Sequence, residues 1–421
     1  MWALALAFAL AAAGDDAHAD ADADDDAALS PDAAVKIALE RSGAVRAVVL
    51  SGEENALKRN LTVPEPTVRV GHQSIDGFFT SPHTDGNGNP YAPLDDTYVS
   101  TTIRTPKPKD VFDQLGNGDA EKADALDVED ARQQLASDVR TLHAQLLALR
   151  EESKLAASAL DILTRLEAQT GVRLNAQATT ALDARLATLT RIDAAADVED
   201  IRAQVVRIDH KLAALLGRPA PLNLASPSKP LCQAPRGDLA SVLARANERS
   251  PSLLALAAQK RRASIEAAVS WTAYLPYLDE VGLGYFNQPL DKRDSVRLFL
   301  DFEIPLFEPI TGRSREAAIE ERRLDALTTD ASRQLEADVR SAYDRLNGAL
   351  ALVQLYDTSK QSIQEALNDV QQALEAGQAD AFRVAEVQAR SVAAERSALH
   401  ARSHCEAAAI ELARLTGDLV P

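Results

Sequence analysis

The chain contains one unit twice, and this repeat limits its possible folds more than any other feature. Residues 131–217 align without a gap to residues 331–417, a shift of 200 positions. The identical pairs include Asp138 and Asp338, Val139 and Val339, Arg140 and Arg340, and Gly217 and Gly417. Upstream, Glu40-Arg41-Ser42 recurs as Glu248-Arg249-Ser250. Units of this kind bury their apolar faces against each other, so the 421 residues predict one interleaved body of two copies.

Composition and motifs exclude several classes of function. The net charge of −18 argues against nucleic acid, and against an anionic membrane surface, as a partner. No nucleophile and base occur together in a plausible site context, so we expect no enzyme. Gly282-x-Gly284 lacks the third glycine of a phosphate-binding loop and is interpreted as strand glycines. We therefore expect no cofactor.

Histidine and cysteine suggest two further sites, and we favour neither. His400 and His404 precede Cys405 at metal-ligand spacing on a helix, but exposed histidines are the preferred interpretation, so we expect no metal. Cys232 and Cys405 are the only two cysteines. A disulfide between them is possible in an oxidising compartment, but we favour two free thiols.

The N-terminus is interpreted as an export signal. Residues 3–13 are apolar and too short to span a bilayer, and small residues that suit cleavage follow. Residues 1–19 are therefore expected to be a signal peptide and 20–29 an acidic disordered segment; a frayed Ala-rich terminus is the alternative. No later stretch approaches 18 apolar residues, so any membrane span must be made of strands.

The aromatic residues support strands in a membrane. No Phe, Tyr or Trp occurs in residues 113–270, and twelve of the chain's 18 aromatics fall within the windows 78–98 and 271–307. Bands of aromatics beside strands are typical of a membrane barrel at the lipid headgroups.

Both copies predict the same order of elements: helix, strand, loop, strand, very long helix, turn, helix. Repeat 1 is expected at 30–217, with a first helix to about 60, strands at about 67–75 and 97–104, and a loop at 76–96. Repeat 2 is expected at 238–417, with strands at about 279–287 and 295–304. A Pro-rich linker, 218–237, joins the repeats, and 418–421 form a tail.

The last strand alternates between an apolar and a charged face. Its charged face carries Arg297, Asp301 and Glu303. The apolar face consists of Val296, Leu298, Leu300, Phe302 and Ile304. Because each copy has only one hairpin, no second sheet is available to cover that face. We therefore expect the apolar face to contact lipid and the charged face to line a lumen.

The helices are long enough to form rods. No proline occurs from 310 to 375, which corresponds to about 100 Å of helix, and a returning helix is expected at 380–416. Apolar residues of copy one step by four and three, as in a coiled coil. They are Leu135, Val139, Leu142, Leu146 and Leu149.

This combination resembles the TolC-like outer-membrane efflux protein family, the exit ducts of tripartite export systems. The resemblance covers nearly the whole mature chain. Its most specific segments are in copy two: Arg249 to Leu253 with Leu275-Pro276, Ile304 to Phe307 with Gly312-Arg313, and Glu375 to Gln378 with Leu415-x-Gly417. Copy one departs from the pattern, with Thr105-Pro106-Lys107-Pro108 at its strand-to-helix junction.

The resemblance implies a homotrimer with an outer-membrane β-barrel and a periplasmic α-helical barrel. It also implies a periplasmic adaptor protein, an inner-membrane transporter and outer-membrane lipid as partners. Four strands do not close a barrel, so the physics requires more than one chain. The tip is expected at the turn 373–386, where the duct closes and the adaptor docks. Its candidate residues are Glu375, Gly377, Asp380, Arg383 and Glu386; the resemblance implies acids at the positions of Arg383 and Glu386.

Two alternatives remain open at this stage. One is a periplasmic coiled-coil scaffold without a pore, which the strand pattern disfavours. The other is a receptor or secretion duct on the same fold. The sequence does not identify the exported substrate.

Overall fold

The computed structural model describes most of the chain. The described residues are 28–60, 66–75, 94–108, 111, 114–177, 179–227, 231–288, 293–304, 313–376 and 381–419. The expected signal peptide 1–19, most of the acidic segment 20–29 and nearly all of the loop 76–96 lie outside them.

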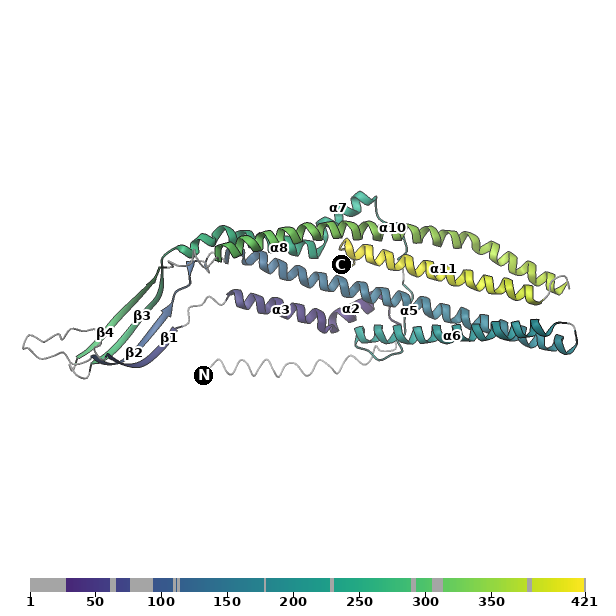
Figure 1. Ribbon diagram of the computed structural model, residues 1–421, viewed down its shortest axis with the longest axis horizontal. Coiled ribbons are helices and arrows are strands. Elements are labelled where there is room, and N and C mark those ends of the chain that lie inside the picture. The colour runs from purple at the N-terminus through teal and green to yellow at the C-terminus, as the bar shows by residue number, and fades with distance from the viewer. Residues whose placement is uncertain are drawn as a thin grey trace, which may run out of the picture. The chain divides into compact units, whose positions relative to one another are not determined.

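Both repeats contain two strands and long helices (Figure 1). Repeat 1 consists of α2 (Pro31–Arg41), α3 (Gly43–Asn60), β1 (Pro66–Ile75), β2 (Leu94–Arg104), η3 (Gln114–Gly116), α5 (Asn117–Asn175) and α6 (Ala181–Leu216). Repeat 2 consists of α7 (Leu239–Arg249), α8 (Pro251–Val269), η4 (Ser270–Tyr274), β3 (Tyr277–Gln288), β4 (Arg293–Glu303), α10 (Arg313–Glu375) and α11 (Ala381–Leu415). The predicted class, mostly α with a small β part, is confirmed. None of the helices in the described ranges has the length and hydropathy to cross a membrane.

The first helix of each repeat is broken at the repeated Glu-Arg-Ser motif, where the sequence predicted continuous helix. Ser42 ends α2 and Ser250 ends α7, both in extended conformation with ψ near 113° and 115°. Pro251 disfavours helical backbone at Ser250. In repeat 1 the Ser42 hydroxyl accepts a hydrogen bond from the Val45 amide, 3.3 Å away, and so caps the start of α3.

The chain forms two compact units, and each draws on both repeats. Unit 1 takes its described residues from within Met1–Arg46, Asp130–Ser250 and Gln334–Pro421, and unit 2 takes its own from Ala47–Glu129 and Pro251–Arg333. The interleaving of the two copies predicted from the sequence is therefore present within each unit.

Unit 1 has a core to which α2, α5, α6 and α11 contribute. Its buried side chains include Val35, Val139, Leu146, Leu212, Leu216 and Ile410. The predicted seam of α5 lies in this core, because Val139 and Leu146 are fully buried and Leu135, Leu142 and Leu149 pack against it. Leu29 adds a parallel bridge to Leu224 of the linker. The α5–α6 hairpin continues away from this core, joined by Ala156, Val198 and Ile201.

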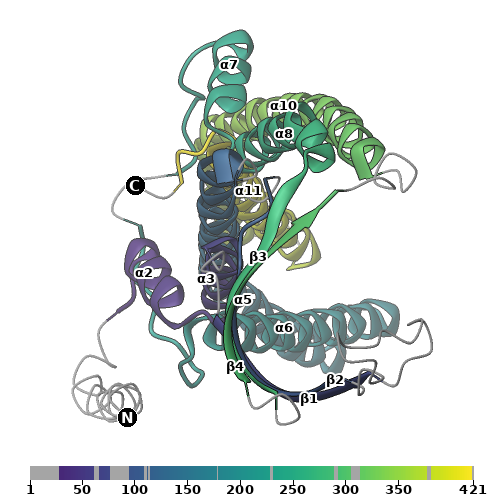
Figure 2. The same ribbon diagram turned by 90° about the vertical axis from the view of Figure 1, so that its left-hand side faces the viewer.

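Unit 2 contains a four-stranded antiparallel sheet in the order β1-β2-β3-β4. Figure 2 shows that the sheet is strongly curved. The helical ends beside it are joined by ion pairs: Arg59 of α3 lies 2.7 Å from Asp124 of α5, and Arg261 of α8 lies 3.3 Å from Asp119.

Candidate functional site

One face of the sheet is apolar and exposed across all four strands. The register aligns Val70, Val99, Tyr285 and Val296 in one row, and Val68, Thr101, Leu283 and Leu298 in the next. The residues expected to contact lipid lie on this face along edge strand β4, except Ile304, which directly follows the strand. Their exposed fractions are 68% for Val296, 66% for Leu298, 53% for Leu300, 63% for Phe302 and 61% for Ile304. So large an exposed apolar surface marks a region that another phase or protein covers.

The opposite face carries an aromatic cluster and the charged residues. Phe286 is buried, with its ring 5.4 Å from that of Tyr98 and 5.5 Å from that of Phe299. The Arg297 guanidinium lies over the Phe286 ring at 4.4 Å. A Cβ atom at Gly284 would approach both phenyl rings within 3 Å, so the cluster requires glycine there. The strand interpretation of Gly282 and Gly284 is therefore correct.

The sheet has two open edges within the described residues. β1 and β4 each pair on one side only, with β2 and β3 respectively. An open edge presents unpaired backbone donors and acceptors, which cannot be left unsatisfied in hydrocarbon. If the exposed apolar face meets lipid, both edges must pair with strands of other chains.

The expected tip residues lie where the second hairpin turns. Glu375 is the last residue of α10, while Gly377 and Asp380 lie outside the described residues. Arg383 and Glu386 are exposed in the first turns of α11. The Glu386 carboxylate lies 2.7 Å from the Arg390 guanidinium, one turn later. The sequence analysis did not consider Arg390, although its position four residues after Glu386 on a helix predicts such an ion pair.

The turn of the first hairpin is held by a capping box. Thr180 accepts a hydrogen bond from the Asp183 amide at 3.2 Å, and the Asp183 carboxylate accepts one from the Thr180 amide at the same distance. Hydrogen bonds from Thr180 and Thr179 lower the pKa of Asp183, so this exposed acid stays ionised.

A buried carboxylate joins the two repeats inside unit 1. Glu152 of α5 is buried and lies 2.9 Å from Arg396 and 3.3 Å from His400, both on α11. Arg396 also pairs with Asp197 of α6 at 2.8 Å. His400 therefore faces a carboxylate of another helix. Nothing local in the sequence predicts this cluster, because Arg396 is 244 residues from Glu152.

The preference for free thiols was wrong. Cys232 of the linker and Cys405 of α11 form a disulfide that spans 173 residues of sequence. Cys405 is fully buried in α11, and the linker passes close enough to bring the two Cα atoms within 5.2 Å. Cys405 is thus not available as the metal ligand that its neighbours His400 and His404 had suggested.

Comparison with known proteins places the second repeat in a family. Residues 242–418 match the model of the family described as outer membrane efflux protein. The second repeat belongs to this family. The matched region includes β3, β4, α10 and α11. It also includes Leu275-Pro276 and Leu415-x-Gly417, two of the segments that carried the resemblance.

Solved structures extend the likeness from the second repeat to the fold of nearly the whole chain. A membrane protein from Pseudomonas aeruginosa has 17% identity and a TM-score of 0.76, and the match covers 92% of this chain and 90% of that one. The open-state MtrE outer membrane channel of Neisseria gonorrhoeae has 18% identity and a TM-score of 0.74, covering 92% and 89%. The outer membrane protein VceC of Vibrio cholerae has 14% identity and a TM-score of 0.74, covering 92% and 96%. No curated protein sequence matches this chain.

The fold of both repeats is therefore that of TolC-like channels, as the resemblance implied. The family of the second repeat and the solved structures also agree with the outer-membrane location expected from the sequence.

Proposed function

We propose that three copies of this chain form an outer-membrane exit duct of a tripartite efflux or secretion system. The duct conducts substrates passively from an inner-membrane pump and a periplasmic adaptor to the exterior. The exposed apolar face that runs in register across four strands with two open edges is the observation that carries this proposal. Lipid would cover the face, and strands of neighbouring copies would pair with the edges.

The charges of the opposite face fit a water-filled lumen. Arg297, Asp301 and Glu303 lie on that face of β4, and the Tyr277 hydroxyl donates a hydrogen bond to the Glu303 carboxylate. We assign these residues to the lumen and Val296, Leu298, Leu300, Phe302 and Ile304 to the lipid side. A coiled-coil scaffold without a pore would not require a sheet with one exposed apolar face and one charged face.

We further propose that the turn 373–386 is the periplasmic tip, where the duct narrows and the adaptor docks. Three copies of Glu375, Asp380 and Glu386 around a narrow axis would attract cations and repel anions. Arg383 and Arg390 reduce that negative charge, so the ring is weaker than the acids alone would make it.

Electrical recording tests both proposals. Purified protein in a planar bilayer should give discrete cation-selective conductance steps, and the absence of any conductance would favour the scaffold. Glu386→Gln or Asp380→Asn should lower cation selectivity. Glu336→Gln is the matched control, because Glu336 forms the same kind of exposed pair with Arg340 on α10. Unchanged selectivity in a conducting channel would place the gate elsewhere, on the turn 170–182 of repeat 1.

A further inference from the structure

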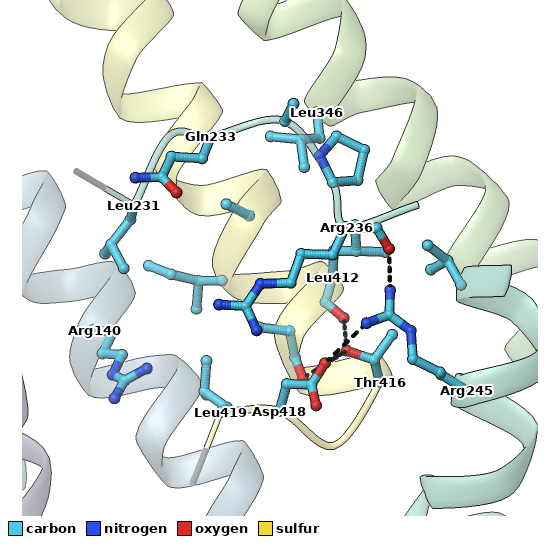
Figure 3. A pocket seen from close by; sticks show the side chains of 16 residues that line it. Arg140, Leu231, Gln233, Arg236, Arg245, Leu346, Leu412, Thr416, Asp418 and Leu419 are labelled. Carbon is cyan, nitrogen blue, oxygen red and sulfur yellow. Dashed lines mark hydrogen bonds and ion pairs between the residues drawn. The ribbon is translucent and has the colours of Figure 1, made fainter. Parts of the chain in front are cut away.

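A cavity of about 280 Å³ lies within unit 1, beside the linker between the repeats (Figure 3). Its walls come from the linker, α7, the last turns of α11 and the tail, with one residue each from α5 and α10. Most of the lining is apolar. The larger apolar residues are Leu231, Val242, Leu346, Ile410, Leu412 and Leu419.

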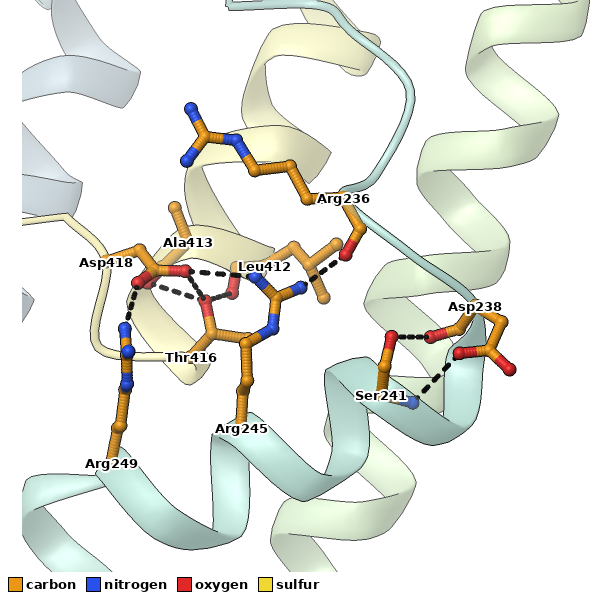
Figure 4. Close-up of polar contacts among 9 residues, drawn as sticks. All are labelled: Arg236, Asp238, Ser241, Arg245, Arg249, Leu412, Ala413, Thr416 and Asp418. Atoms are coloured by element: carbon orange, nitrogen blue, oxygen red, sulfur yellow. Dashed lines mark hydrogen bonds and ion pairs between the residues drawn. The ribbon is translucent and has the colours of Figure 1, made fainter.

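The charged residues in the lining are three arginines and one aspartate: Arg140, Arg236, Arg245 and Asp418. The Asp418 carboxylate already has protein partners (Figure 4). Arg249 lies 3.0 Å from one of its oxygens. The other oxygen lies 3.9 Å from Arg245 and accepts a hydrogen bond of 3.1 Å from the Thr416 hydroxyl. Arg245 also donates a hydrogen bond of 2.6 Å to the Arg236 carbonyl. The lining therefore carries a surplus of positive charge in a chain of net charge −18.

Two of these arginines have donors to spare. The Arg236 guanidinium has no hydrogen-bond or ion-pair partner among the described residues, and its side chain extends from the linker toward the middle of the lining residues (Figure 3). Arg140 donates to Asp32 at 2.8 Å through one terminal nitrogen, but its Nε is buried without a hydrogen-bond partner. An anion that enters the cavity would pair with the Arg236 guanidinium, and the charge of Arg140 in the same lining would add to the attraction.

The wall that carries Arg236 is held in place. The disulfide of Cys232 fixes the linker to α11 four residues before Arg236. After Arg236, Gly237 turns the chain with φ of 99°, and Asp238 caps α7 by accepting from the Ser241 amide at 3.1 Å. A site whose walls are already ordered loses less entropy when a ligand binds.

We propose that this cavity binds a small organic anion: a carboxylate, sulfonate or phosphate monoester on an aromatic or short aliphatic body. The anionic group lies between Arg236 and Arg140, and the body packs against the leucines and Ile410. The site is separate from the surfaces assigned to the lipid, the lumen and the tip, so it stands whether or not the duct function does.

Fluorine NMR of trifluoromethylbenzoate with the purified full-length protein tests the proposal. We expect saturable binding, and at least a tenfold weaker affinity for Arg236→Gln, which removes one charge-assisted contact. Arg333→Gln, an exposed arginine of unit 2 paired with Asp330, is the matched control and should bind like the wild type. Neutral trifluoromethylbenzamide should bind at least tenfold more weakly than the benzoate.

Three outcomes would overturn the inference. The first is no saturable binding of the benzoate up to about 1 mM. The second is equal affinity of the wild type and Arg236→Gln, since Arg236 lies on an exposed linker and its loss leaves the core intact. The third is displacement by inorganic sulfate at the same concentrations as the benzoate, which would show that the apolar wall contributes nothing to recognition.

Discussion

His143 is a buried titratable residue that holds the start of the described chain. It lies on α5, is 1% exposed, and its Nε2 is 3.0 Å from the Leu29 carbonyl oxygen. Burial lowers the pKa of His143; the hydrogen bond to Leu29 raises it, and the positive charge of Arg150 lowers it further. The ring is therefore neutral in the folded protein, with Nε2 donating to Leu29.

This residue should make stability depend on pH. The unfolded chain protonates His143 near pH 6.5, while the folded chain resists protonation. The unfolded state thus binds more protons, and the contribution of His143 to stability falls as pH decreases below about 6.5. His143→Gln can keep the hydrogen bond to Leu29 but does not titrate. We therefore expect its melting temperature, measured by circular dichroism, to fall less than that of the wild type as the pH decreases below about 6.5.

His210 provides the control for this prediction. It is exposed on α6, so His210→Gln should leave the pH profile as in the wild type. Other groups contribute to the pH dependence as well; burial raises the pKa of Glu406, for example. The informative quantity is therefore the difference in melting temperature between variant and wild type at each pH. Parallel profiles for His143→Gln and the wild type would contradict the assignment.

At the scale of elements, the alternating sequence of β4 corresponds directly to the two environments proposed for its faces, lipid on one side and a water-filled lumen on the other. Leu300 pairs with Val281 on the apolar face, and Asp301 pairs with Glu280 on the other. Both side chains are exposed in the single chain, so a sheet in water would tolerate substitution at either position.

Lipid would make the two positions differ. Leu300→Arg should cost roughly 2–4 kcal/mol if the residue lies near the bilayer midplane, whereas Asp301→Asn should be nearly neutral. Heat-modifiable migration on gels, after folding into detergent or lipid, measures the folded fraction of each variant. Similar losses at both positions would mean that the alternation of the strand between a lipid face and a lumen face has been misread.

At the scale of the whole molecule, the open edges of the sheet predict assembly. Bacterial barrels have at least eight strands, and the described part of this chain supplies four. Two or three copies would close a barrel; the resemblance to TolC-like ducts selects three. Native mass measurement in detergent should give three chains, and a stable monomer would contradict the proposal.

Cross-linking gives a more specific form of this prediction. Val70 lies on edge strand β1 and Val296 on edge strand β4, so β4 of one copy should meet β1 of the next. The double variant Val70→Cys/Val296→Cys, treated with a short bismaleimide, should give linked dimers and trimers on denaturing gels. The single variants are the controls and should remain monomeric. The native cysteines do not interfere, because they are bonded to each other.

The sequence by itself determined what depends on neighbouring residues. The alternation around Leu298 and Leu300 specified a strand with two different faces, since side chains of a strand alternate by geometry. The spacing from Leu135 to Leu149 specified the buried stripe of α5, since every third or fourth residue of a helix shares one face. The repeat itself specified that the two copies would interleave, because neither buries its apolar residues alone.

Only the tertiary structure decided which distant residues meet. The disulfide joins Cys232 to Cys405 across 173 residues, and Glu152 meets Arg396 across 244. The cavity beside the linker likewise combines Arg140 of α5 with Arg236 and Asp418. Such contacts depend on how α5, α7, α11 and the linker pack inside unit 1. That packing is fixed by the burial of many side chains at once, so no local pattern in the sequence specifies it.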